Sequence, residues 1–255
     1  MNRLRFIVIA IALSIAACSD DKVTAPDPQP VQGTVLTASG DITAKVDEFR
    51  ALLGASNGGT AGEQPAGRRE ISWDGAGANP FDNRNDFPAA FFNTNVKSGA
   101  IFTTAGSGFR NDSTSFVDLD PSYAAEFTFF SANKIFAAIG SNVVDQTFQV
   151  AGQPTPAVVR AFGIVFSDVD LATRTTIQLF AQDGTTLGTF AAPVRTDAAG
   201  LSFVGVSYAT AVIARVRITL GTGALGAGVK DVSAGGTADL VVFDNVIYGE
   251  PKQAF

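Results

Sequence analysis

The sequence contains no histidine, and only one cysteine, one tryptophan and three tyrosines in 255 residues. Without histidine, the chain cannot form a Ser-His-Asp or Cys-His nucleophilic site, or a zinc site with a histidine ligand. A single cysteine excludes an intrachain disulfide and a multi-cysteine metal cluster. The net charge of -6 argues against a nucleic-acid binder, because such a protein needs basic groups to neutralise phosphates.

The composition nevertheless indicates a folded chain. Hydrophobic residues make up 46% of the sequence and charged residues 16%, which is typical of a protein that buries a core. Phenylalanine supplies 21 of the side chains. Unlike tyrosine and tryptophan, it fills a dry core without needing a hydrogen-bond partner, so the chain is suited to a large apolar interior.

The N-terminus carries the features of a bacterial export signal. Arg3 and Arg5 give a short positive segment, and residues 6–17 carry no charge over a length too short to span a bilayer. The apolar run ends at Cys18, and the quartet Ile-Ala-Ala-Cys at 15–18 resembles the lipobox of bacterial lipoproteins. This resemblance implies cleavage before Cys18 and acylation of its thiol; the alternative is an ordinary signal peptide with a buried cysteine.

Removal of residues 1–17 would change the net charge to -8, because Arg3 and Arg5 are lost with them. The attachment to the membrane is therefore expected to come from lipid, since two or three acyl chains hold a protein stably on a bilayer. Ser19 after the cysteine resembles the sorting pattern of outer-membrane lipoproteins. The expected location is the cell envelope, at the outer membrane of a Gram-negative bacterium, facing the periplasm or the surface.

Three segments are predicted: a signal peptide at 1–17, a lipid-anchored tether at 18–40 and a single folded domain at 41–255. The tether is predicted because Pro26, Pro28 and Pro30 disfavour both a helix and a sheet ladder. No second linker interrupts the rest of the chain. The domain is predicted to begin with a short amphipathic helix, capped by Asp41, whose apolar residues recur at helical spacing: Ile42, Val46, Phe49 and Leu53.

Beyond this helix the chain is a series of short strand-like runs. In residues 214–220 apolar side chains alternate with Arg215, Arg217 and Thr219, a pattern typical of a strand with one buried face. The two arginines are expected to pair with carboxylates on neighbouring strands, although an anionic polymer is an alternative partner. Asp183-Gly184 predicts a tight hairpin turn. Further strands are predicted at 69–73, 100–104, 124–130, 135–140, 145–150, 160–167, 176–181, 186–190, 201–208 and 239–248. This arrangement predicts an all-β sandwich.

Several stretches of the chain together carry a resemblance to known proteins. They are AFGIVFSDVD (161–170), TTIQLFAQDGTTLGTF (175–190), GLSFVGVSY (200–208), IARVRITLG (213–221) and DLVVFDNVIYGEP (239–251), and more loosely GRREISWDG (67–75) and SGAIFTTAGSGF (98–109). In this order they resemble exported bacterial jelly-roll proteins of the galactose-binding-like kind, a group of mostly uncharacterised function in which many members carry lipid or sorting anchors. The resemblance implies a jelly-roll β-sandwich. The last strand, with Asp244 and Asn245, is similar to that of carbohydrate-binding modules, in which an acidic residue there contributes to a structural calcium site.

Calcium is the one candidate cofactor. Asp168 and Asp170 place two carboxylates on the same side of a strand end, and Asp244 and Asn245 supply further oxygens from the last strand. Calcium binds six to eight oxygens, so neither pair is sufficient alone. The four residues are a hypothetical structural calcium site, and the alternative is that they are solvated carboxylates in turns.

A loop near the only tryptophan is the candidate ligand-binding site. Trp73 and Asp74 lead into a polar loop, and together they offer an aromatic ring flanked by amide, carboxylate and guanidinium groups, as a sugar requires. The loop residues are Asp82, Asn83, Arg84 and Asn85. The alternative, which turn chemistry favours, is a surface loop with Trp73 buried in the core. The scarcity of tryptophan and tyrosine also argues against a broad sugar-binding platform.

The predicted function is that of a lipid-anchored cell-envelope β-sandwich with a non-catalytic binding, adhesion or structural role. A carbohydrate-binding module with structural calcium is the first alternative, and a glycan-active hydrolase or lyase is the second. Two carboxylates suffice for glycoside hydrolysis, and Glu70 and Glu126, both in predicted strands, are the candidate acids. The expected partners are a membrane, through the lipid, and an envelope or extracellular glycan, but no nucleic acid.

Overall fold

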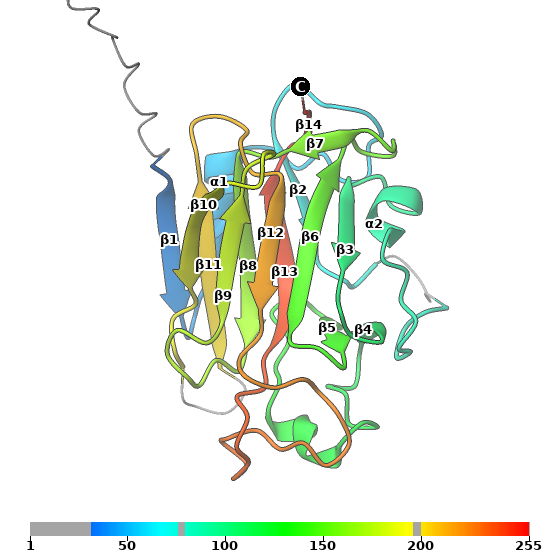
Figure 1. Cartoon of the computed structure of the whole chain (residues 1–255), viewed down its shortest axis with the longest axis vertical. Helices are drawn as coiled ribbons and strands as arrows, with labels where there is room; N and C mark the ends of the chain where they lie inside the picture. Colours follow the sequence, from blue (N-terminus) through cyan, green and yellow to red (C-terminus); the bar gives the residue numbers. More distant parts are fainter. Residues whose placement is uncertain (1–31, 76–79, 196–199, 255) are drawn as a thin grey trace, which may run out of the picture. The chain divides into compact units, whose positions relative to one another are not determined.

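The computed structural model describes residues 32–75, 80–195 and 200–254, which fold as two antiparallel sheets packed face to face (Figure 1). The predicted all-β sandwich is therefore confirmed. Cys18, the predicted signal peptide and the proline-rich part of the predicted tether lie outside the described residues. Among the described residues, no helix has the length and hydropathy needed to cross a membrane.

The first sheet has seven strands, and the long strand β13 (Val242–Gly249) lies at its centre. In spatial order they are β1 (Thr34–Ser39), β11 (Leu201–Ser207), β8 (Ala161–Ser167), β13, β5 (Ile135–Ile139) and β4 (Gly108–Asp112), with β2 (Arg68–Ile71) paired to β13. Every pairing among them is antiparallel.

The second sheet also has seven strands and lies in front of the first in Figure 1. In spatial order they are β10 (Thr186–Ala191), β9 (Thr176–Phe180), β12 (Arg215–Thr219), β6 (Val143–Gln149), β7 (Pro156–Val158) and β14 (Lys252–Gln253), with β3 (Ala100–Thr103) paired to β6. From β8 to β13 the chain passes repeatedly from one sheet to the other.

The core fills the space between the sheets. On β6 the side chains of Val144, Gln146 and Phe148 are buried, while their neighbours along the strand are only half-buried. On β8 and β13 every residue is buried. A strand buried on both faces must have a second layer outside it, because period-two alternation would otherwise leave one face in water.

That outer layer is α1 (Thr43–Leu53), which covers the first sheet. The helix follows from the apolar spacing: Ile42, Val46, Phe49 and Leu53 are buried and form a second core with residues of β8, β11 and β13. Asp41 accepts a hydrogen bond from the Thr43 N–H at 3.2 Å, and Gly54, with φ 93°, ends the helix. The predicted amphipathic helix is confirmed.

Two glycines make room for this helix. Gly163 on β8 and Gly205 on β11 are paired in register, directly beneath the ring of Phe49. A Cβ atom at Gly163 would lie 2.6 Å from Phe49 Cε1, and one at Gly205 would lie 2.9 Å from the same ring. The absence of side chains at this pair therefore allows the close approach of α1 to the sheet.

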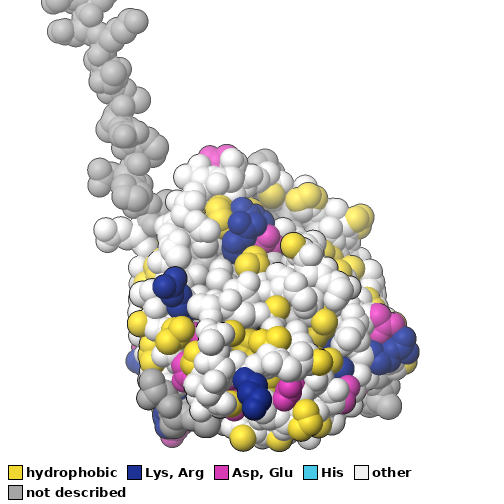
Figure 2. All heavy atoms as spheres, turned by 60° about the horizontal axis from the view of Figure 1, so that its bottom comes forward, with side chains coloured by type: hydrophobic (Ala, Val, Ile, Leu, Met, Phe, Trp, Pro, Cys, Tyr) yellow, Lys and Arg dark blue, Asp and Glu magenta, His cyan; other side chains and the backbone are white. Residues whose placement is uncertain are grey.

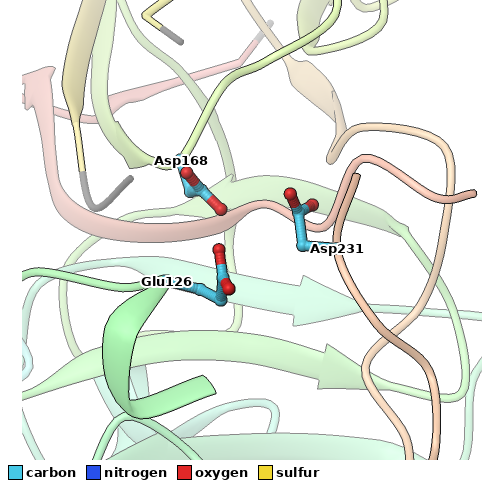
Figure 3. Close-up of side chains that lie close together, drawn as sticks. All are labelled: Glu126, Asp168 and Asp231. Atoms are coloured by element: carbon cyan, nitrogen blue, oxygen red, sulfur yellow. The ribbon is translucent and has the colours of Figure 1, made fainter. Parts of the chain in front are cut away.

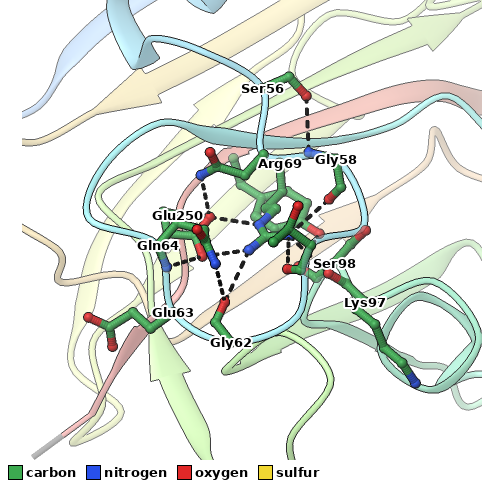
Figure 4. A network of polar contacts seen from close by, with 12 residues as sticks. Ser56, Gly58, Gly62, Glu63, Gln64, Arg69, Lys97, Ser98 and Glu250 are labelled. Carbon is green, nitrogen blue, oxygen red and sulfur yellow. Dashed lines mark hydrogen bonds and ion pairs between the residues drawn. The ribbon is translucent and has the colours of Figure 1, made fainter.

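A buried arginine organises the loop that follows α1. Arg69 on β2 is fully buried, and its guanidinium donates to both carboxylate oxygens of Glu250 at 2.7 Å. It also donates to backbone carbonyls of the surrounding loops: those of Gly58, Gly62 and Lys97, which Figure 4 labels, and that of Thr60. Because Glu250 directly follows β13, this network fastens the loop to the central strand.

The folded domain begins earlier than predicted. Residues 34–39, assigned to the tether by the sequence, form β1 and pair with β11 from Thr34↔Ser207 to Ser39↔Ser202. The boundary at Gly40 is thus too late. The pattern was missed because an edge strand buries little: only Leu36 and Ala38 reach the core beneath α1, and Val35 is exposed.

The strand predicted at 124–130 is wrong. Its first residues belong to the 3₁₀ helix η1 (Pro121–Ala125), which Asp120 caps by accepting from the Ser122 N–H at 2.9 Å. Proline at the first helical position and an aspartate before it favour such a turn. Phe127 then packs in a small separate core with Phe116 and Tyr123. A second short helix, α2 (Phe91–Thr94), and the strands β4, β7 and β14 were not predicted.

Two further expectations are met at β9, β12 and β6. The β9–β10 hairpin forms at the predicted place, although Gly184 alone adopts positive φ, and the turn runs from Ala181 to Thr185. Arg215 and Arg217 on β12 both pair with Asp145 on the adjacent strand β6, at 2.8 and 2.9 Å. The pairing with a neighbouring carboxylate is confirmed.

Candidate functional site

Trp73 lies in the core and not on the surface. It is 3% exposed, and its ring stacks on Phe136 with 3.9 Å between ring centroids. Its indole Nε1 donates to the backbone carbonyl of Asp244 at 2.7 Å. The predicted aromatic platform for a sugar is therefore not formed by Trp73, and the alternative, a buried core tryptophan, describes its position.

The polar loop residues are bonded to the protein itself. Asp74 accepts from the Asn133 N–H, and Asp82 accepts from Asn111 and forms an ion pair with Lys134. These contacts fasten the loop to β4 and to the start of β5.

The rest of the loop reaches the surface. Asn83 accepts from the Ser113 N–H, Arg84 pairs with Asp86, and Asn85 accepts from Arg110. Asn83, Arg84 and Asn85 line an open depression with Asp86 and Arg110, so the structure brings together three of the six candidate ligand residues.

The four candidate calcium ligands do not form one site. Asp244, on β13, accepts three hydrogen bonds, from the N–H groups of Phe130 and Ser131 and from Ser131 Oγ. The amide of Asn245 donates to Glu70 at 2.8 Å. Both residues are thus engaged within the sheet, away from the end of β8 where Asp168 and Asp170 lie.

The antiparallel pairing of β8 with β13 explains this separation. Val242 is opposite Ser167, so the residues beyond the end of β8 lie beside the segment that precedes β13. Asp239, in that segment, accepts from the backbone N–H groups of Asp170 and Leu171 at 3.3 and 3.1 Å. The strand register therefore brings Asp239, and not Asp244, next to Asp168 and Asp170.

Five carboxylates meet at this end of the sandwich, which we call the end-loop acidic cluster: Glu126, Asp168, Asp170, Asp231 and Asp239. In three of them, Glu126, Asp168 and Asp231, one carboxylate oxygen of each lies within 4.8 Å of the others. Figure 3 shows these three side chains pointing toward one another from three segments of the chain. Glu126 follows η1, Asp168 follows β8, and Asp231 lies in the long loop between β12 and β13.

Local hydrogen bonds hold two of these side chains in place. Asp231 accepts from the N–H groups of Ser233 and Leu240 at 2.7 and 2.6 Å. The hydroxyl of Ser233 donates to Glu126, which joins the long loop to the residue after η1. Asp168 is different: its backbone has φ 70°, and neither oxygen of its fully buried carboxyl has a hydrogen-bond partner.

The electrostatics of the end-loop acidic cluster disfavour the ionised form of Asp168, Asp170 and Asp239. Burial raises the pKa of Asp168 to about 9, and the charges of its four acidic neighbours act in the same direction. Burial also raises the pKa of Asp170 to about 6, assisted by a hydrogen bond with Asp231, and it raises the pKa of Asp239. None of the ion pairs between described residues involves these five side chains. The cluster therefore suits protons or a bound cation.

The two candidate acids of a hydrolase are both bonded within the protein. Glu126 is 4% exposed, in the end-loop acidic cluster, and Glu70 pairs with Arg50 and accepts from Asn245. Closely spaced carboxylates are thus present, but neither Glu70 nor Glu126 lines any of four cavities on the described surface.

Asp231 and Asp239 are the site residues that the sequence did not indicate. They lie in a glycine-rich stretch without hydrophobic alternation, and only the Asp231-x-Ser233 spacing, typical of a side chain that bonds the backbone two residues on, marks the first of them. Comparisons of the chain with protein-family models, with curated proteins and with solved structures found no match.

Proposed function

We propose that the protein is a lipid-anchored domain of the cell envelope with a non-catalytic binding, adhesion or structural role. The sequence at 15–18 supports the anchor, because Cys18 stands directly after an uncharged apolar run and is the only cysteine. The segment of sequence between Cys18 and β1, which begins at Thr34, is short. This supports a domain held near a membrane. The expected membrane is the outer membrane of a Gram-negative bacterium.

Burial of the reactive groups supports the non-catalytic role, and it is the observation on which this proposal mainly rests. The carboxylates that approach one another most closely, those of Glu126, Asp168 and Asp231, are each less than one-tenth exposed. On the face seen in Figure 2, charged side chains lie singly or in small groups among uncharged ones. General acid catalysis requires a carboxyl within hydrogen-bond reach of the substrate, which a buried cluster does not offer.

The anchor is tested by metabolic labelling of the full chain in a Gram-negative host. We expect wild-type protein to incorporate an alkyne-labelled fatty acid and to fractionate with membranes. The Cys18→Ser variant, which lacks the acceptor thiol, should lose both properties, while the neighbouring Ser19→Ala variant should keep the label. Labelling of the Cys18→Ser variant would contradict the proposed anchor.

Carbohydrate binding is the second candidate. The depression lined by Asn83, Arg84, Asn85, Asp86 and Arg110 favours it, because amide, guanidinium and carboxylate groups are the usual partners of sugar hydroxyls. A panel of polysaccharides separates the possibilities. Binding that is lost in an Asn83→Ala, Asn85→Ala variant supports this candidate, whereas turnover that is lost in a Glu70→Gln, Glu126→Gln variant would contradict a non-catalytic role.

A further inference from the structure

We infer that the end-loop acidic cluster is the binding site of a calcium ion, held by Glu126, Asp168 and Asp231 with Asp170 and Asp239 beside them. This inference goes beyond the proposed function, because it depends on neither the anchor nor a glycan. It also places the ion away from Asp244 and Asn245, which the sequence had joined with Asp168.

The first support is the carboxyl of Asp168. It is fully buried, neither of its oxygens has a hydrogen-bond partner, and it points at Glu126 and Asp231 (Figure 3). Buried polar groups in folded proteins are nearly always bonded, and a buried carboxylate is costly unless it is paired or coordinates a metal. Asp244 shows the ordinary solution in the same protein, since it accepts three hydrogen bonds. Asp168 therefore lacks a partner that a cation would supply.

The second support is distance. One oxygen each from Glu126, Asp168 and Asp231 lies within 4.8 Å of the other two. Calcium contacts its oxygen ligands at roughly 2.3 to 2.6 Å, so two oxygens on one ion are at most about 5 Å apart. A single ion can thus reach all three carboxylates with small adjustments of their side chains. Asp170, whose Oδ1 is also buried without a partner, is a further source of an oxygen ligand.

The donor set favours calcium among the common metal ions. All five side chains are carboxylates, and the chain contains no histidine to attract zinc, copper or nickel. Magnesium is usually bound by one or two carboxylates and keeps several waters in an octahedron. Calcium accepts six to eight oxygens in an adaptable geometry, which suits ligands that come from three separate segments.

The position of the cluster gives the ion a structural consequence. It would join the end of η1, the end of β8 and the loop between β12 and β13, which are neighbours in space but distant in sequence (Figure 1). Ser233 already links two of these segments through Glu126. A ligand that binds only the folded state stabilises it, and the melting temperature rises with the logarithm of the ligand concentration once this exceeds the dissociation constant. Calcium is therefore expected to stabilise this end of the sandwich.

The test uses the full-length chain in detergent, stripped with EGTA and then titrated with calcium chloride alone. Isothermal titration calorimetry should show one calcium ion per chain, and the melting temperature should rise with added calcium and fall again in EGTA. Magnesium at the same concentration should produce a smaller rise. Absence of calcium binding, or of any change in melting temperature, would overturn the inference, and a larger effect of magnesium would overturn the assignment to calcium.

The variants Asp168→Asn and Glu126→Gln should each weaken calcium binding by at least about tenfold, because affinity follows the number of charged ligands. Asp244→Asn, a buried carboxyl outside the cluster, is the matched control and should bind calcium like the wild type. In EGTA, Asp168→Asn should melt no lower than the wild type, since the amide has the size of the carboxyl it replaces and asparagine tolerates positive φ. Wild-type calcium affinity in both cluster variants would refute the site.

Discussion

Individual buried acids of this protein differ in what surrounds them. Asp244 and Asp168 are both fully buried, yet three donors face the first and none faces the second. This difference in hydrogen-bond donors cannot be seen in the sequence, where both residues are aspartates next to apolar runs. At this scale the chemistry of a residue is decided by the few groups within hydrogen-bond reach.

The raised pKa of Asp244 predicts that the stability of the protein depends on pH. Burial raises the pKa of this carboxyl from 3.8 to about 6, even though the hydrogen bonds from Ser131 and Phe130 act in the opposite direction. Between about pH 4 and pH 6 the folded state therefore keeps a proton that the unfolded state releases. From this group alone, the free energy of unfolding should fall by about 3 kcal/mol as the pH rises through that interval.

The variant Asp244→Asn isolates this contribution. Its amide oxygen can accept from the Phe130 and Ser131 N–H groups, and its amide nitrogen can donate to Ser131 Oγ, which itself donates to the carbonyl of Ser72. We expect the variant to fold and, in urea unfolding at a series of pH values, to lack this part of the decline. An identical decline in variant and wild type would show that Asp244 titrates normally.

At the scale of elements, the contact of α1 with the first sheet depends on two residues that have no side chain. The ring of Phe49 packs directly on Gly163 and Gly205. It also packs edge-on against Phe203, with ring centroids 5.6 Å apart. The helix itself was predictable because its apolar residues have helical spacing. Its docking place was not, since a glycine in a strand has several explanations until its neighbours are known.

Gly163→Ala should reduce the free energy of unfolding by about 1 to 3 kcal/mol, because its Cβ would lie 2.6 Å from a carbon of the Phe49 ring. Urea unfolding measures this loss. Phe49→Leu removes the ring, so the two substitutions together should cost less than the sum of their separate effects. Strictly additive losses would indicate that the ring of Phe49 does not determine the cost at Gly163.

Prediction of elements succeeds where one face of a strand is buried and fails at edges. β12 was expected because Val216 and Ile218 alternate with Arg215 and Arg217, and the two faces of this strand differ. β1 was missed because it buries little at a sheet edge. Residues 124–130 were mistaken for a strand because Phe127 is buried, and Phe129 partly buried, in a loop core. Alternation of apolar and polar residues indicates which side chains are buried. Side chains can also be buried in a loop, so the alternation alone does not establish a strand.

At the scale of the whole molecule, a buried ion pair joins residues 181 positions apart. Arg69 and Glu250 are both buried, and Asn57 and Gln64 also donate to the Glu250 carboxylate. The pair fastens the loop after α1 to the end of the central strand (Figure 4). Such a pair depends on both partners, because either one alone would be an uncompensated buried charge.

Glu250→Gln should therefore reduce the free energy of unfolding by about 3 to 5 kcal/mol, since the buried guanidinium of Arg69 would lose its counter-charge. Thermal and urea unfolding of the full chain measure the loss. Glu63→Gln is the matched control: Glu63 is exposed and pairs with Lys252 at 3.2 Å, so its loss should cost less than about 1 kcal/mol. Equal effects of the two substitutions would contradict a structural role for the Arg69–Glu250 pair.

The candidate site was predicted only in part. Asp168 and Asp170 were selected because two carboxylates with one residue between them lie at the end of an apolar run. Their partners were assigned to Asp244 and Asn245, whereas the register of β8 with β13 brings in Asp239, and the loops bring in Asp231 and Glu126. No local pattern contains this information, because the five residues come from three separate segments.

The sequence by itself determined the all-β class, the leading helix and the exclusion of histidine and disulfide chemistry, because alternation, helical spacing and composition are local properties. It also carries the prediction of an anchor at Cys18, which lies outside the described residues. Only the tertiary structure decided that Trp73 is core and that five carboxylates converge at one end of the sandwich. Convergence depends on strand register and loop closure, which bring together residues more than 100 positions apart.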